Sequence, residues 1–190
     1  MMPTELFKNA DLLFITSRAD AFANAIVMST TTAGQHLHYD HVALVEVTAK
    51  HQVFVLHALP KSGSIREPYA AFQKRHYALV DLYRVQHPLQ AELIIAQAKS
   101  QLGQVYNHSY APTAAGYYCA DFIFAAFASD QIFTLRPMSF KAPTQQTLLP
   151  FWRAYYAQLG CAVPEGELGL NPNAMARQNC LRKVTTLVAP

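Results

Sequence analysis

The stretch that decides the fold is HVALVEVTAKHQVFVLHA, residues 41–58. Two runs rich in β-branched residues predict a pair of strands, and residues 49–52 between them predict a hairpin turn. Side chains alternate between the two faces of a strand. A turn centred near residue 50 therefore places His41 and His57 opposite or diagonal across the ladder, about 5 to 8 Å apart at Cβ. The hairpin predicts two neighbouring imidazoles at its open end.

A cysteine lies at a predicted junction between a loop and a helix, in GYYCAD, residues 116–121. The apolar run 122–128 that follows predicts the helix. The N-terminal end of a helix carries a partial positive charge and free N–H groups, which favour the reactive thiolate. Cys119 is therefore a candidate nucleophile. The alternative is a buried small hydrophobic residue, the usual role of a free cysteine.

Further strands and helices are predicted on both sides of these two stretches. The expected strands are 12–16, 63–65, 77–84 and 183–188, and the expected helices are 21–28, 67–75, 88–102 and 145–159. These elements predict an α+β fold, in which the cysteine helix packs against a mostly antiparallel sheet of five or six strands. No linker divides the chain, so we expect one domain, 1–190, with 161–190 as a C-terminal extension packed on it.

The composition excludes several classes of protein. The chain has 190 residues, of which 52% are hydrophobic and 14% charged, so it is neither disordered nor a coiled coil. The net charge is +3 and the basic residues are scattered, which argues against a nucleic-acid partner. No apolar run reaches about 18 residues, so no transmembrane segment is expected.

The cysteine count and the N-terminus bear on location. Three cysteines, Cys119, Cys161 and Cys180, do not form a disulfide framework and favour a reducing setting. The first residues lack a basic segment followed by an apolar one, the pattern of a secretory signal. We therefore expect a cytoplasmic protein. The sequence does not indicate the oligomeric state.

Cysteine hydrolase chemistry requires a nucleophile, a base, a group that orients the base, and donors for the oxyanion. The candidates are Cys119 as nucleophile, His41 as base and His57 as the orienting group. The backbone N–H of Cys119 and the hydroxyl of Tyr106 are candidate oxyanion donors, and Tyr118 is a further candidate for substrate binding. In this hypothesis the imidazole holds Cys119 as a thiolate and later protonates the leaving amine. No cofactor is implied.

A metal site is the main rival interpretation of the polar residues. His36, His38 and Asp40 alternate on one face of an extended segment, but their spacing matches no strong zinc motif. We expect them instead on the polar outer side of a loop. Asp121 is interpreted as a cap or a hydrogen-bond acceptor, because a carboxylate beside the site would oppose a thiolate.

Five segments together resemble the circularly permuted NlpC/P60 hydrolases, papain-like proteins typified by the bacterial YiiX-like group. The segments are DLLF (11–14), YDHVALV (39–45), VLHALP (55–60), LGQVYN (102–107) and YYCAD (117–121). The resemblance covers about residues 11–172, and the histidines precede the cysteine, as in the permuted group.

This resemblance implies a thiol-dependent amidase or peptidase with Cys119 as nucleophile and His41 as base. It places His57 at the third polar position, where many YiiX-like proteins have an acidic residue, and Tyr106 near the oxyanion. Ala120 and Asp121 stand where Ser and Glu are often found. The expected substrate is a small peptide, amide or lipid-linked molecule. Two alternatives remain: a lipid acyltransferase or deacylase of the lecithin:retinol acyltransferase type, and a non-catalytic binding module on the same fold.

Overall fold

A computed structural model describes residues 6–18, 20–31, 38–142 and 146–187 of the chain. The elements, in order, are β1 (Leu12–Thr16), α1 (Ala21–Thr30), β2 (His41–Val47), β3 (Val53–Leu59), β4 (Gly63–Pro68), α2 (Tyr69–Gln73), β5 (Leu79–Val85), α3 (Ala91–Ser100), α4 (Cys119–Ala126), β6 (Arg136–Pro137), α5 (Pro150–Leu159), β7 (Leu168–Gly169), α6 (Pro172–Ala176) and β8 (Leu181–Leu187).

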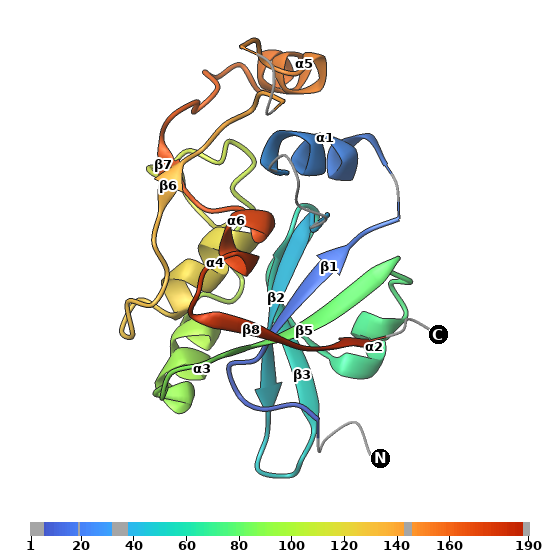
Figure 1. Cartoon of the computed structure of the whole chain (residues 1–190), viewed down its shortest axis with the longest axis vertical. Coiled ribbons are helices and arrows are strands. Elements are labelled where there is room, and N and C mark those ends of the chain that lie inside the picture. The colour runs from blue at the N-terminus through green and yellow to red at the C-terminus, as the bar shows by residue number, and fades with distance from the viewer. Residues whose placement is uncertain (1–5, 19, 32–37, 143–145, 188–190) are drawn as a thin grey trace.

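Six strands form one central sheet in the order β4-β3-β2-β1-β5-β8, and every neighbouring pair is antiparallel. This arrangement confirms the predicted α+β fold and the predicted number of strands. β8 is the edge strand beside β5, so the C-terminal region supplies one strand of the main sheet. In Figure 1, α1, α5 and the short β6–β7 pair lie toward one end of this sheet.

The β2–β3 hairpin has the predicted register. Val47 pairs with Val53 and Leu44 pairs with Leu56, so the turn centres on residue 50. Continuing that register, His57 lies opposite Ala43, two residues along β2 from His41. The two histidines are thus diagonal neighbours on the same face of the sheet.

Two hydrophobic clusters cover the two faces of the sheet. One contains Val42 and Leu44 with the buried side of α4, and it continues to α3 and α5. The other contains Ala43 and Val45 with Phe72 from α2. The alternation of side chains along β2 therefore assigns α4 and the two histidines to opposite faces of the sheet.

Several predicted boundaries were wrong, and the boundary between β4 and α2 matters for the site. β4 runs to Pro68, beyond the predicted end at 65, and α2 begins only at Tyr69. Glu67 is therefore a strand residue that pairs with Val55, not the start of a helix. α5 begins at Pro150 rather than at 145, with the proline in the first turn, where its missing N–H costs no hydrogen bond.

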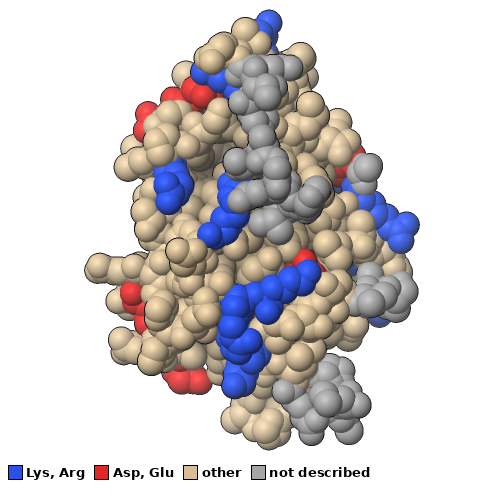
Figure 2. Space-filling view, in the orientation of Figure 1, with Lys and Arg blue, Asp and Glu red and all other residues tan. Residues whose placement is uncertain are grey.

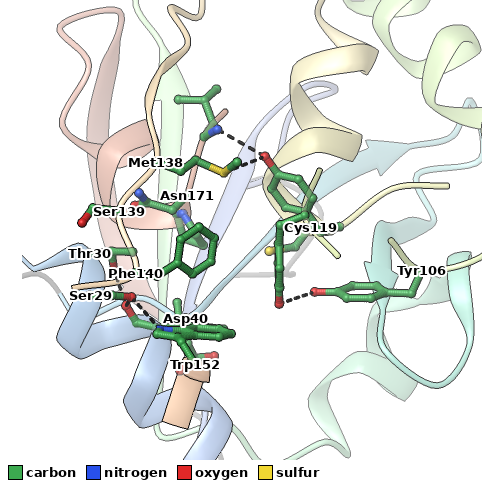
Figure 3. Close-up of a pocket in the computed structure, with 15 residues that line it drawn as sticks. Ser29, Thr30, Asp40, Tyr106, Cys119, Met138, Ser139, Phe140, Trp152 and Asn171 are labelled. Atoms are coloured by element: carbon green, nitrogen blue, oxygen red, sulfur yellow. Dashed lines mark hydrogen bonds between the residues drawn. The ribbon is translucent and has the colours of Figure 1, made fainter. Parts of the chain in front are cut away.

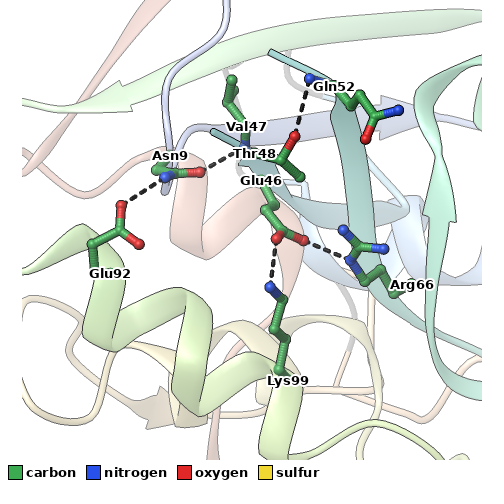
Figure 4. A network of polar contacts seen from close by, with 8 residues as sticks. All are labelled: Asn9, Glu46, Val47, Thr48, Gln52, Arg66, Glu92 and Lys99. Atoms are coloured by element: carbon green, nitrogen blue, oxygen red, sulfur yellow. Dashed lines mark hydrogen bonds and ion pairs between the residues drawn. The ribbon is translucent and has the colours of Figure 1, made fainter. Parts of the chain in front are cut away.

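The end of β2 farthest from His41 is tied to its surroundings by polar contacts (Figure 4). Glu46 accepts hydrogen bonds from Arg66 of β4, at 2.6 Å, and from Lys99 of α3. Asn9 accepts from the N–H of Val47 at 2.6 Å. These contacts join α3 to the sheet. Among the residues that the structure describes, no helix is both long and apolar enough to cross a bilayer.

Candidate active site

Cys119 is the first residue of α4, as the sequence predicts. The residue before it, Tyr118, has extended backbone (φ −90°, ψ 174°) and forms no side-chain cap bond. The loop leading to it is held in place by Gly116, which has a φ of +82°. A Cβ there would lie 2.0 Å from the carbonyl oxygen of Val105, so the close approach requires glycine. The chain thus fixes where the helix begins.

The thiol of Cys119 is almost completely buried, with 5% of the residue exposed. Burial raises the pKa of Cys119 to about 12, although the N–H groups of Val42 and Ala120 face the sulfur and act in the opposite direction. Val42 directly follows His41 on β2. The paired ladder between β2 and β3 begins only at Leu44 and Leu56, so the sulfur meets β2 where the two strands have separated.

His41 and His57 are in direct contact, as the hairpin predicts. His41 Nε2 and His57 Nδ1 are 3.0 Å apart, and both residues are buried. The other ring nitrogen of His57 lies 3.0 Å from Oε1 of Glu67. Arg75 donates to both oxygens of Glu67, at 2.7 and 3.0 Å. The contacts form a chain from His41 through His57 and Glu67 to Arg75.

This chain of contacts determines which nitrogens carry protons. Burial alone raises the pKa of Glu67, but the hydrogen bonds from His57 and Arg75 outweigh it and lower that pKa to about 2. An ionised carboxylate can only accept, so His57 carries its proton on Nε2 and presents a lone pair at Nδ1. His41 must then donate from Nε2. Its Nδ1 is left with a lone pair and is free to act as a base.

The structure does not join Cys119 to His41 directly. Within the described residues, His57 is the one hydrogen-bond partner found for the His41 ring, and none joins that ring to the thiol. Val42, whose N–H lowers the pKa of the Cys119 thiol, directly follows His41, so both side chains are near the start of β2. A shift of side chains is needed before a proton passes between them.

Cys119 lines a narrow pocket of about 50 Å³ on the α4 side of the sheet (Figure 3). Tyr106 and Tyr118 line the same pocket, so three of the five predicted site residues lie together here. His41 and His57 are not among its lining residues. The Tyr106 hydroxyl is 3.5 Å from that of Tyr110, and the Tyr118 hydroxyl accepts from the N–H of Leu170 at 3.3 Å. Seven of the twelve other lining residues are apolar or aromatic: Ile26, Tyr110, Met138, Phe140, Trp152, Leu170 and Pro172.

We expected Asp40 on the polar outer side of a loop, but the structure places it in the interior. It is 7% exposed, accepts from the N–H and the hydroxyl of Ser17 at 2.7 and 2.6 Å, and lines the Cys119 pocket. Of its predicted companions, His36 lies outside the described residues and His38 is exposed. In the described part of the chain, no group of three or more His, Cys, Asp or Glu side chains is placed to hold a metal ion.

Asp121 lies in the first turn of α4, where burial raises its pKa to about 6. Its side chain accepts no hydrogen bond from another described residue, so the expected role as an acceptor is not found. Glu67 and Arg75 also belong to this site, and no sequence motif marks either residue. A β4 strand that is predicted to continue to residue 67 would place Glu67 diagonally across from His57, by the same alternation that pairs the two histidines.

The burial of both groups works against the expected resting thiolate–imidazolium pair. Burial lowers the pKa of His41 well below its usual value, and the nearby His57 and Arg75 lower it further. Burial also raises the pKa of the Cys119 thiol, so both shifts favour the neutral thiol and the neutral imidazole in the substrate-free protein.

We therefore expect Cys119 to react slowly with iodoacetamide near neutral pH, and more slowly than the exposed Cys161. With a pKa near 12, only about one thiol in 10⁵ is ionised at pH 7, because each pKa unit is a factor of ten. Alkylation over a range of pH, followed by peptide mapping, measures this. Rapid labelling of Cys119 at about pH 6, where an ordinary thiol is protonated, would show instead a resting ion pair.

Comparison with known proteins agrees with the fold. Residues 7–185 match the family of permuted papain-like amidase enzymes that includes YaeF and YiiX. The crystal structure of the metalloprotein YiiX from Escherichia coli superposes with a TM-score of 0.76, covering 95% of this chain and 97% of that one at 19% identity. No curated protein sequence matches the chain. Because the family match extends over nearly the whole length, the chain belongs to the permuted papain-like amidases.

Proposed function

We propose that this amidase is cysteine-dependent, with Cys119 as nucleophile and His41 as general base. The observation that carries the proposal is the hydrogen-bonded chain from His41 to Glu67. It leaves an unprotonated nitrogen on His41 and supplies a negative charge for the imidazolium that forms. A buried histidine with that tautomer has the properties of a general base.

In the proposed reaction, substrate binding brings the thiol and His41 Nδ1 together. The sulfur attacks the amide carbon as its proton passes to His41, and the new S–C bond forms a tetrahedral intermediate. The C–N bond then breaks, and His41 returns the proton to the leaving amine. Water attacks the resulting thioester with His41 again as base, which releases the acid and restores the thiol.

The oxyanion in this scheme has two sets of donors. The backbone N–H groups at the start of α4 point toward the sulfur, where the helix terminus also supplies a partial positive charge. The Tyr106 hydroxyl lines the same pocket. Burial raises its pKa well above its ordinary value, so Tyr106 stays protonated and is able to donate.

Capture of the acyl-enzyme tests this proposal. The protein is incubated with N-acyl p-nitroanilides of increasing acyl length and quenched in acid, and its mass and peptide map are measured. We expect release of nitroaniline and an acyl adduct on Cys119. The His41→Gln variant should release no nitroaniline and accumulate no adduct, because acylation requires the base. Release of nitroaniline by a His41→Gln protein, or an adduct on Cys161 instead, would contradict the mechanism.

A further inference from the structure

A second pocket opens directly beside the one that holds Cys119. Its volume is about 320 Å³, and it shares five lining residues with the inner pocket: Ser29, Thr30, Met138, Ser139 and Asn171. Three basic residues line it, Arg136, Lys141 and Arg177, and its lining contains no acidic side chain. A substrate that reaches the thiol through this opening passes a positively charged wall.

The two arginines of this wall have no acidic partner in the described part of the chain. Arg136 is exposed at the start of β6, and within the described residues its side chain forms no ion pair or hydrogen bond. Arg177 directly follows α6, and among the residues that the structure describes its guanidinium donates only to the carbonyl oxygen of Thr30, at 3.4 and 3.5 Å. In Figure 2, basic side chains lie over this β6 and α6 region.

The neighbouring charged groups do not neutralise the pair. Lys141 pairs with Glu165 at 3.3 Å, so these two charges offset each other. Glu167 lies beside β6, where its carbonyl accepts from the N–H of Met138, but its carboxylate pairs with neither arginine. Arg136 and Arg177 line the same pocket. Burial lowers the pKa of Arg177, and the charge of Arg136 lowers it further.

Two adjacent guanidinium groups without a carboxylate are suited to bind an anion, because each presents a planar set of donors that matches a carboxylate or a phosphate. The inner pocket has the opposite character, with Phe140, Trp152 and Leu170 around the thiol. Apolar walls with a few well-placed polar groups are typical of small-molecule sites. The two pockets together match one amphiphilic molecule.

We propose that the substrate is an N-acyl amine with a short apolar acyl group and an anionic group on the amine side. The acyl group occupies the inner pocket beside Cys119, and a carboxylate or a phosphate binds Arg136 and Arg177. This inference rests on the proposed function, since it specifies the substrate of the same thiol. N-acyl amino acids have this chemistry, and so do N-acyl phosphoethanolamines.

Equilibrium binding tests the inference without requiring catalysis. The Cys119→Ala protein is titrated with N-acetylglycine, with the neutral N-acetylglycinamide, and with N-acetyl-O-phosphoethanolamine, because the narrow inner pocket of about 50 Å³ fits only a short acyl group. We expect an anionic ligand to bind about tenfold or more tightly than the neutral amide, as charge-assisted hydrogen bonds allow. The tighter of the two anionic ligands identifies the anion. Equal binding of the neutral amide and both anions would overturn the proposal.

Variants of the arginines then locate the site. Arg136→Gln and Arg177→Gln should each remove most of the preference for the anion and leave binding of the neutral amide unchanged. Arg182→Gln, on β8 and outside this pocket, is the matched control and should keep the preference. Arg136 is exposed, so its variant should fold even if that of Arg177 does not. Equal loss of both ligands in the Arg136→Gln protein, or an unchanged preference, would contradict the site. Because these measurements do not depend on turnover, failure of the cysteine mechanism would leave them interpretable.

Discussion

Replacing Cys119 with alanine should abolish amide hydrolysis while leaving the fold intact. Loss of a nucleophile removes the covalent route entirely, and in cysteine and serine hydrolases such losses reach about 10⁴- to 10⁶-fold in kcat. The change deletes one buried sulfur atom, which should cost about 1 to 2 kcal/mol of stability, toward the lower end for a buried large-to-small substitution. Initial rates on the substrate captured as an acyl-enzyme, together with thermal unfolding, measure both effects.

The other cysteines provide the control for this experiment. Cys161 is exposed and Cys180 is half-buried, and neither lines the pocket of Cys119. Cys161→Ala and Cys180→Ala should therefore keep wild-type rates. A Cys119→Ala protein that retains more than about a tenth of the activity would rule out covalent catalysis, given the size of the expected loss. If neither the wild type nor the variant cleaves any amide, the fold serves as a binding module.

The hairpin of residues 41–58 shows why part of the site was predictable. Its register follows from local information, because the alternation of apolar residues and the length of the turn both determine which residues face each other. The contact between His41 and His57 follows from that register alone. The position of Cys119 at a helix start was equally local, since the apolar run and the preceding turn residues mark the boundary.

The remainder of the site depends on contacts that no local pattern records. Ser64, Arg66 and Glu67 interrupt the apolar alternation of β4, so only pairing with β3 shows that the strand continues to Pro68. The Cys119 pocket collects residues as distant as Ile26 and Leu170. The protonation state of the thiol is likewise a property of burial, and a helix N-terminus alone predicts the opposite state.

Replacing Glu67 with glutamine should lower kcat by roughly 100- to 1,000-fold with little change in KM. The neutral amide cannot stabilise the imidazolium that forms on His41. The amide also has one NH₂ group, which must point toward either Arg75 or His57. Toward Arg75, two hydrogen-bond donors oppose each other. Toward His57, the NH₂ group donates to Nε2, so the His57 proton moves to Nδ1 and His41 must carry its own proton on Nδ1, where it can no longer act as a base. In serine proteases the corresponding change beside the catalytic histidine costs about 10⁴. We expect less here, because Glu67 acts through one additional ring.

Glu46 provides a matched control for a purely structural effect. Like Glu67 it accepts short hydrogen bonds from two basic residues, but it lies at the far end of β2 and away from the thiol. Glu46→Gln should therefore destabilise the protein while kcat stays unchanged. A Glu67→Gln protein that loses stability but keeps wild-type kcat would place Glu67 in the same structural class and remove it from the mechanism.

The pH dependence distinguishes a positioning residue from a stabilising one. Glu67 opposes the lowering of the His57 pKa by burial, so its removal should move the acid limb of the kcat/KM profile to lower pH.

The dependence of stability on pH gives an independent measure. The folded pKa of Glu67, about 2, lies below its ordinary value of 4.5, so its contribution is present above that value and is lost as the pH falls toward 2. The wild type should lose stability over this range more steeply than Glu67→Gln, because the variant has no carboxylate to protonate. If Glu67→Gln both shifts the acid limb of the kcat/KM profile and loses less stability at low pH than the wild type, then the Glu67 carboxylate both stabilises the fold and orients the base.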